Sequence, residues 1–363
     1  MRKLSVQDME DLLSGGLILG CGGGGESQAG KALIEEAYRN EKDFYLIDLN
    51  EIDDENIYCL VSYVGGGIAE EEEALIKGLK KTMDYPILKA VQELSRYLGK
   101  EFSGYYPSEI GAGNTIAAMF VAAMEGKPTI DGDTAGGRSK PETAISTTHI
   151  AGIQPHPIAI VNAFGEVVLI KRCIDDYRAE TLSRYVSRVS GGRCAAARCA
   201  VKGKELRGGI CSGSISLAIG AGRIIRTAKK DPVSELIKFL KGKELFLGTV
   251  ADFDQDKKHG FNWGTISLDG IQNYKGMNYK IWYKNEHLVA LKNNEVHITC
   301  PDNIIIVDAE SGKGLYNKPD DFYKGRKVVV IGREAGNIWK TEKGLEIFGP
   351  GHFGFDIPYK PFT

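Results

Sequence analysis

Residues 17–40, LILGCGGGGESQAGKALIEEAYRN, set the fold class expected of this chain. The apolar triplet Leu17–Leu19 predicts a short buried strand, and the glycine run at residues 20–25 predicts a tight turn that opens a helix. A second unit repeats this order, because the strand IYCLVSYV at 57–64 ends in three glycines and a helix rich in Glu and Lys follows. Repeated strand–glycine–helix units predict a mostly parallel sheet covered by helices.

The sequence changes character after about residue 165. Two helices are expected at 175–190 and 215–228, and from residue 245 onward short apolar segments alternate with Gly, Asn and Asp. Turn residues spaced roughly every 8–12 positions favour a β-sandwich or a barrel-like module. We therefore expect an α/β domain at 1–165 that carries the main site and a β-rich (α+β) domain at 166–363 that supplies a wall.

Composition excludes several classes of protein. The 363 residues include 46 Lys+Arg and 48 Asp+Glu, and the resulting net charge of −2 argues against a nucleic-acid partner. No apolar run approaches the ~20 residues that span a bilayer, and the start MRKLSVQDMEDLL lacks the apolar core of a signal peptide. Seven cysteines without a C-x-x-C pair favour free thiols. We expect a cytoplasmic protein with no membrane partner.

The glycine run permits two interpretations. Gly20, Gly22 and Gly25 satisfy G-x-G-x-x-G, and Asp48 lies where a ribose-binding acid would be, which is the dinucleotide fingerprint. The favoured alternative is a turn whose main-chain amides line a pocket, since positive φ and close approach are what glycine allows. The substrate-binding residues expected on that basis are Gly22, Gly23, Gly24 and Gly25.

The densest polar chemistry lies between residues 107 and 156. Asp131, Asp133, Arg138 and Glu142 are the expected catalytic residues, because Asp131 follows the apolar segment PTI and strand ends face the ligand crevice in such sheets. His149 with Asp131 and Asp133 would suit a divalent ion, zinc above all. The alternative is that either aspartate caps a turn and pairs with Arg138.

Residues outside this stretch are expected to reach the same crevice. Glu109 and Asn114 stand at the two ends of the loop EIGAGN and are assigned to substrate binding. In the β-rich part most motif residues are aromatic or structural. Asn285, Glu286 and Asp356 are the exceptions that we expect to be able to reach the cleft.

The sequence resembles the S-methyl thiohydantoin desulfurase family, whose members often occur beside hydantoinase-type enzymes. The motifs that carry the resemblance follow one another along nearly the whole chain: GCGGGGES, EIGAGN, DGDTAGGRSKPE, GSISLAIGAGR, YKNEHLVAL, CPDNIIIVDAESG and GPGHFGFDIPYKP. It implies an α/β domain followed by a β-rich domain. It also implies hydrolysis of a small five-membered ring, in which water replaces a methylthio group.

The leading hypothesis is a hydrolase that acts on a hydantoin-like or thiohydantoin-like cyclic amide, with a divalent metal as a possible cofactor and no organic cofactor. An NAD(P)- or nucleotide-binding enzyme is the first alternative, and it depends on the glycine fingerprint. A non-catalytic accessory subunit of a hydantoinase-type complex is the second. A small-molecule substrate and a homo-oligomeric assembly are expected in the leading case.

Overall fold

The computed structural model describes residues 1–362, in which two large β-sheets carry the fold. In spatial order the first sheet consists of β1 (Arg2–Lys3), β2 (Tyr45–Ile47), β5 (Thr129–Ile130), β4 (Gly104–Pro107), β3 (Ile57–Gly65), β9 (Arg193–Lys202), β7 (Ile158–Val161) and β8 (Val167–Ile170). The second sheet consists of β15 (Glu295–Thr299), β14 (Glu286–Lys292), β13 (Asn278–Lys284), β12 (Phe261–Gly270), β11 (Lys243–Lys258), β17 (Lys327–Arg333) and β16 (Asn303–Asp308). A short pair joins β6 (Gly132–Asp133) to β10 (Cys211–Ser212).

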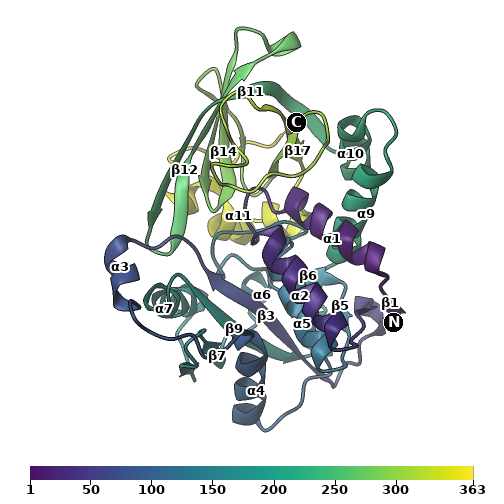
Figure 1. Cartoon of the computed structure of the whole chain (residues 1–363), viewed down its shortest axis with the longest axis vertical. Helices are drawn as coiled ribbons and strands as arrows, with labels where there is room; N and C mark the ends of the chain where they lie inside the picture. Colours follow the sequence, from purple (N-terminus) through teal and green to yellow (C-terminus); the bar gives the residue numbers. More distant parts are fainter. Residues whose placement is uncertain (363) are drawn as a thin grey trace.

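Helices surround the first sheet and extend between the two sheets (Figure 1). They are α1 (Val6–Leu19), α2 (Ser27–Arg39), α3 (Glu70–Leu75), α4 (Pro86–Leu98), α5 (Asn114–Met124), α6 (Thr147–Ile150), α7 (Asp176–Val189), α8 (Gly203–Leu206), α9 (Ser214–Thr227), α10 (Pro232–Leu240) and α11 (Glu342–Phe348). The predicted fold class, an α/β part followed by a β-rich part, is confirmed.

The first sheet is mixed. Its block β2-β5-β4-β3 is parallel, as the repeated strand–helix units predict, whereas β1, β9, β7 and β8 add antiparallel strands on the two flanks. Strands β8 and β9 come from beyond residue 165, and the second sheet begins only at Lys243. The first sheet thus takes strands from both sides of the expected domain boundary.

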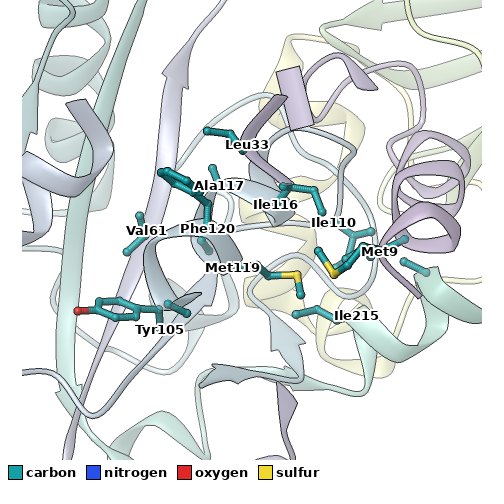
Figure 2. Close-up of a cluster of buried hydrophobic side chains, with 14 of the residues drawn as sticks. Met9, Leu33, Val61, Tyr105, Ile110, Ile116, Ala117, Met119, Phe120 and Ile215 are labelled. Atoms are coloured by element: carbon teal, nitrogen blue, oxygen red, sulfur yellow. The ribbon is translucent and has the colours of Figure 1, made fainter. Parts of the chain in front are cut away.

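Helix α5 forms the centre of the main core. Its sequence NTIAAMFVAAM is apolar on every side, and a helix of that kind is buried all round. Phe120 lies near Val61 of β3, and Met119 lies near Met9 of α1 (Figure 2). The same core includes Ile305, Val307, Val329 and Ile331 of the second sheet, so the two parts of the chain share one hydrophobic interior.

The second sheet is antiparallel throughout and curls until β16 contacts β14. Aromatic side chains fill its concave interior, with Phe246 stacked on Tyr279 at 4.8 Å and Phe253 on Phe322 at 5.4 Å between ring centroids. The expected run of short strands is therefore confirmed, in the form of one curled sheet.

The expected strand at Leu17–Leu19 is wrong, because these residues form the last turn of helix α1. The helix begins at a capping box in which Ser5 and Asp8 satisfy each other's backbone N–H groups, and it continues without interruption through Gly15 and Gly16. Those glycines are needed for packing, since a Cβ on Gly15 would lie 1.7 Å from the carbonyl oxygen of Ala218 in α9. The glycine run therefore follows a helix and not a strand.

We predict that Gly15→Ala destabilises the protein by roughly 1–3 kcal/mol, because the new methyl group forces α1 and α9 apart. Thermal and urea denaturation measure the effect. Gly208→Ala is the matched control, because the nearest atom to a Cβ there is 3.7 Å away. Equal stability of the two variants would contradict the close contact between these helices.

Candidate active site

A polar cleft of about 710 Å³ lies where the two parts of the chain meet. Its walls include the ends of β3 and of the parallel strand next to it, and the carboxyl edge of parallel strands is the usual ligand site of such sheets. The other walls come from the glycine run, the segment 140–143, the start of β14 and the loop at 316–319.

The glycine run connects α1 to α2 and is held from both sides by main-chain hydrogen bonds. His287 N–H donates to the Cys21 carbonyl at 2.9 Å, and Asn114 N–H donates to the Gly24 carbonyl at 3.0 Å. Gly24 has φ of 75°, and a Cβ there would lie 2.6 Å from the Cα of Gly111. Only glycine fits this position, so the run can pass between the loop 109–114 and the second sheet.

Glu286, the first residue of β14, is the central carboxyl group of the cleft. Its Oε1 accepts hydrogen bonds from the Ser139 hydroxyl at 2.7 Å and the Gly24 N–H at 3.2 Å, whereas its Oε2 is buried without a partner. Burial, followed by the charge of Glu109, raises the pKa of Glu286 to about 8. The group is therefore a neutral carboxylic acid at pH 7 and can donate a proton.

Glu109 is held rigidly beside it. Its Oε1 accepts a hydrogen bond from Asn114 Nδ2 at 2.6 Å, and its Oε2 accepts one from the Lys140 N–H at 3.0 Å. Asn114 is oriented in turn, because its Oδ1 accepts from the Tyr63 N–H at 3.1 Å. Two carboxyl groups in different hydrogen-bonding environments can divide the roles of acid and base.

Lys140 adds a buried amine. Its Nζ donates to the Thr134 hydroxyl at 2.9 Å. Burial, followed by the charge of Arg198, lowers the pKa of Lys140 to about 8. Perturbed groups gathered in a cleft indicate a reactive site more than a structural one.

The cleft also contains polar atoms that have no partner within residues 1–362. They are Ser62 Oγ, Asn262 Oδ1 and Glu286 Oε2, each on a residue that lines the cleft. A buried polar atom without a hydrogen bond costs about 1–3 kcal/mol, so such atoms are rare unless a water or a ligand satisfies them. Three of the eight such atoms within residues 1–362 belong to residues of this one cleft, which favours a ligand-binding role.

Among the four residues expected to be catalytic, Glu142 lines the cleft, where it forms ion pairs with Lys284 and His352. Burial raises the pKa of Glu142, but the hydrogen bond from His352 and the charge of Lys284 outweigh that effect and lower it to about 2. Glu142 is therefore an ionised carboxylate whose two oxygens are already engaged.

Asp131 and Asp133 serve the backbone and do not line the cleft. Asp131 accepts hydrogen bonds from the N–H groups of Ile215 and Ser216 at the start of α9, both at 3.0 Å. Asp133 accepts from the N–H groups of residues 135–137, and burial raises its pKa to about 6. These contacts match the capping part of the alternative, but its other part is wrong, because Arg138 donates to carbonyl oxygens and to neither aspartate.

Arg138 and His149 are also engaged elsewhere. The fully buried guanidinium of Arg138 donates to four carbonyl oxygens, those of Ser139, His287, Pro301 and Asp302, and so ties the two parts of the chain together. His149 Nδ1 lies 3.0 Å from the Ala144 carbonyl oxygen, and the ring edge meets Tyr177. The structure thus does not gather the five residues expected at the reactive centre.

The expected metal set is not assembled either. Within residues 1–362 no three His, Cys, Asp or Glu side chains are close enough to hold an ion together, so Asp131, Asp133 and His149 do not form a zinc donor set. The zinc cofactor therefore stays a prediction.

The remaining expected residues divide between the cleft and its surroundings. The cleft is lined by Gly23, Gly24, Gly25, Glu109, Asn114, Asn285 and Glu286. Gly22 does not line it but pairs with Tyr316, which does, and Asp356 does not reach it. Lys140 was missed, although it lies inside the stretch DGDTAGGRSKPE. In the sequence Lys140 is visible only as a charged residue within a polar stretch. Residue type alone does not reveal that its side chain is buried.

The fold and the cleft together define a two-sheet α/β protein that holds buried acid–base groups where its two parts meet. The chain belongs to the S-Me-THD-like family, because the family's N-terminal domain matches residues 7–172 and its C-terminal domain matches residues 174–362. This confirms the resemblance found in the sequence.

A solved X-ray structure of a protein from Chromobacterium violaceum is similar to this chain, with a TM-score of 0.84 and 22% sequence identity over 100% of both chains. At that identity the likeness establishes the fold alone. A search of curated proteins found no match. None of the helices within residues 1–362 has both the length and the apolar character that crossing a membrane requires.

We predict that Glu286 makes the protein less stable as the pH rises from about 6.5 to 8, because its carboxyl group keeps its proton to about pH 8 when folded, against 4.5 as its ordinary pKa. At this site the folded state binds more protons than the unfolded chain, so Glu286 lowers the free energy of unfolding by roughly 1–2 kcal/mol across this interval. Lys140, whose pKa burial lowers from 10.5 to about 8, acts with the opposite sign over the same interval and offsets this effect in the wild type. Asp133 and His287, with pKa values of about 6 and about 4, titrate mainly below it.

Melting temperatures at the two pH values provide the measurement. Glu286→Gln should become more stable relative to the wild type as the pH rises over this interval, whereas Glu295→Gln, an exposed control on β15, should follow the wild type. The same change with pH in Glu286→Gln as in the wild type would refute the raised pKa.

Proposed function

We propose that this protein is a small-molecule hydrolase that acts on a hydantoin-like five-membered ring, with replacement of a methylthio group by water as the reaction to test first. The observation that carries the proposal is the buried group Glu109, Lys140 and Glu286 around one cleft, in which burial holds Glu286 as a neutral carboxylic acid and Glu109 is fixed by two hydrogen bonds. Membership of the S-Me-THD-like family supports the choice of ring.

The proposed reaction divides between the two carboxyl groups. Glu109 accepts a proton from a water molecule while the oxygen of that water bonds to the ring carbon that carries sulfur. The carbon–sulfur bond then breaks, and Glu286 gives its proton to the departing sulfur, which leaves as methanethiol. The proton on Glu109 returns to Glu286 through solvent in the cleft. The remaining proton of the water moves from the new hydroxyl group to the ring nitrogen, so the ring carbon ends as a carbonyl. General acid–base catalysis by each of the two carboxyl groups would raise the rate by about 10²–10⁴-fold.

The main chain and Lys140 would stabilise the developing charge. The N–H of Gly25 donates no hydrogen bond within residues 1–362, and Gly25 lines the cleft, so this amide is available to a ring oxygen. The amine of Lys140, with a pKa of about 8, is largely protonated at pH 7 and places a positive charge beside the same cleft. Fixed donors aimed at the developing charge are a large source of catalysis.

The two alternatives receive less support. A dinucleotide site needs a strand before the glycine fingerprint, and helix α1 occupies that position. An accessory subunit without catalysis would not need a buried carboxyl group and a buried amine with shifted pKa values in its cleft. The cytoplasmic location, the homo-oligomeric assembly and the zinc cofactor stay predictions, and metal analysis of the purified protein tests the last of these.

We predict that the wild type releases methanethiol from an S-methyl thiohydantoin and that Glu286→Gln lowers kcat by about 10²-fold or more, because an amide cannot supply the proton. In the wild type, kcat should fall above about pH 8, where Glu286 loses its proton. A thiol-reactive dye follows the product. Glu295→Gln should retain wild-type turnover, and full activity of Glu286→Gln would remove Glu286 from the mechanism.

A second substitution tests the position of the same carboxyl group without changing its chemistry. A Cβ on Gly23 would lie 1.9 Å from Glu286 Oε1, so Gly23→Ala must displace the carboxyl group. We expect kcat to fall by at least about tenfold, since small misplacements of catalytic groups are costly. Gly208→Ala serves as the control. Unchanged kcat in a folded Gly23→Ala protein would show that this contact is unimportant.

A further inference from the structure

The cleft is much larger than the ring that the proposed function assigns to it. Its volume of about 710 Å³ falls within the ~300–1,000 Å³ that sites for drug-sized ligands occupy. A five-membered ring fills only a small part of such a space. The rest of the cleft must therefore accommodate a substituent on the ring, and the charges of its walls indicate what kind of substituent fits.

Several charged side chains of the cleft walls already have a partner of opposite charge. Glu26 pairs with Lys318, Glu142 with Lys284 and His352, and Arg184 with Glu180. These pairs neutralise one another and leave no preference for a charged ligand.

Two cations of the cleft are different. Arg193 and Lys257 line the cleft and are exposed, and neither forms an ion pair within residues 1–362. They come from separate sheets, since Arg193 begins β9 and Lys257 lies near the end of β11. The loop of Gly65 to Gly67 lies between them, because a Cβ on Gly65 would lie 3.0 Å from the Cα of Arg193 and one on Gly67 would lie 2.7 Å from the Cβ of Lys257.

Arg193 is held in place without losing its hydrogen-bonding capacity. Its guanidinium lies over the ring of Tyr63, 3.7 Å from the centroid, and donates no hydrogen bond within residues 1–362. Stacking on an aromatic face fixes the plane of the group and leaves its N–H donors available for a planar anion.

Arg193 is connected to the reactive end of the cleft through residues in direct contact. The Tyr63 on which it stacks donates its N–H to Asn114 Oδ1 at 3.1 Å. Asn114 Nδ2 donates in turn to Glu109 Oε1 at 2.6 Å. One ligand could place its ring at Glu286 and a charged substituent at Arg193.

We propose that the substrate carries a carboxylate substituent on its ring and that Arg193, assisted by Lys257, recognises it. The inference rests on the proposed function for the ring itself. A guanidinium forms two parallel hydrogen bonds with a carboxylate, which gives selectivity for that group over a neutral amide of the same shape. The ring chemistry then stays with Glu109 and Glu286, and Arg193 determines specificity.

The test compares two substrates that differ in one group. Both are S-methyl thiohydantoins, one with a carboxymethyl and the other with a carbamoylmethyl substituent on the ring. The wild type should show at least about tenfold higher kcat/KM for the acid, through a lower KM, and this preference should weaken with added salt. Arg193→Gln should abolish the preference, Arg193→Lys should retain part of it, and Arg172→Gln, an exposed control, should keep it.

Calorimetric binding of the two compounds, measured separately from methanethiol release, distinguishes the two proposals. Tighter binding of the acid without any turnover would support the carboxylate site and overturn the proposed hydrolysis. Turnover of both compounds with equal kcat/KM would overturn the carboxylate site and leave the hydrolysis intact. A preference for the acid that survives in Arg193→Gln would also overturn the assignment, because the selectivity would then come from another group.

Discussion

The contact between the Glu286 carboxyl group and the backbone of Gly23 and Gly24 is the constraint on which the site depends. It exists because these positions have no side chain, since a Cβ on Gly23 would lie 1.9 Å from Glu286 Oε1. The contact brings a residue of the second sheet into the crevice of the first. The glycine run is therefore best understood as a surface for close approach, and its positive φ angles are the conformations that only glycine adopts without strain.

Desolvation near this contact shifts the ionisation of the buried groups. Lys140 and Glu286 are both buried at the cleft, and burial opposes charge on each of them. The pKa values of Glu286 and Lys140 therefore approach each other, both near 8. A site with these properties is costly for folding, because the protein keeps groups that would be more stable in water. The shared hydrophobic core and the buried Arg138, which binds carbonyl groups of both parts, offset that cost.

Asp131, Asp133 and Arg138 show how structural and catalytic residues can be confused. Their residue types and their place after a strand resemble a catalytic cluster. Each of them, however, forms hydrogen bonds with backbone groups. A carboxylate that receives several N–H groups is a good cap and a poor base, because its lone pairs are occupied. Glu286 differs from them in having one buried oxygen with no partner.

The sequence by itself determined the two-part fold, the parallel strands of the first sheet and the involvement of the glycine run, Glu109 and Asn114. Periodicity and glycine position report local backbone structure, and these features are local. Motifs spread along the chain also identified the family. Only the tertiary structure decided that Leu17–Leu19 continues a helix, that Asp131 and Asp133 are caps, and that Glu286 joins Lys140 at the cleft. Burial and partnership often depend on residues far apart in the sequence, 84 positions for Asp131 and Ile215 and 147 for Ser139 and Glu286, which no local pattern encodes.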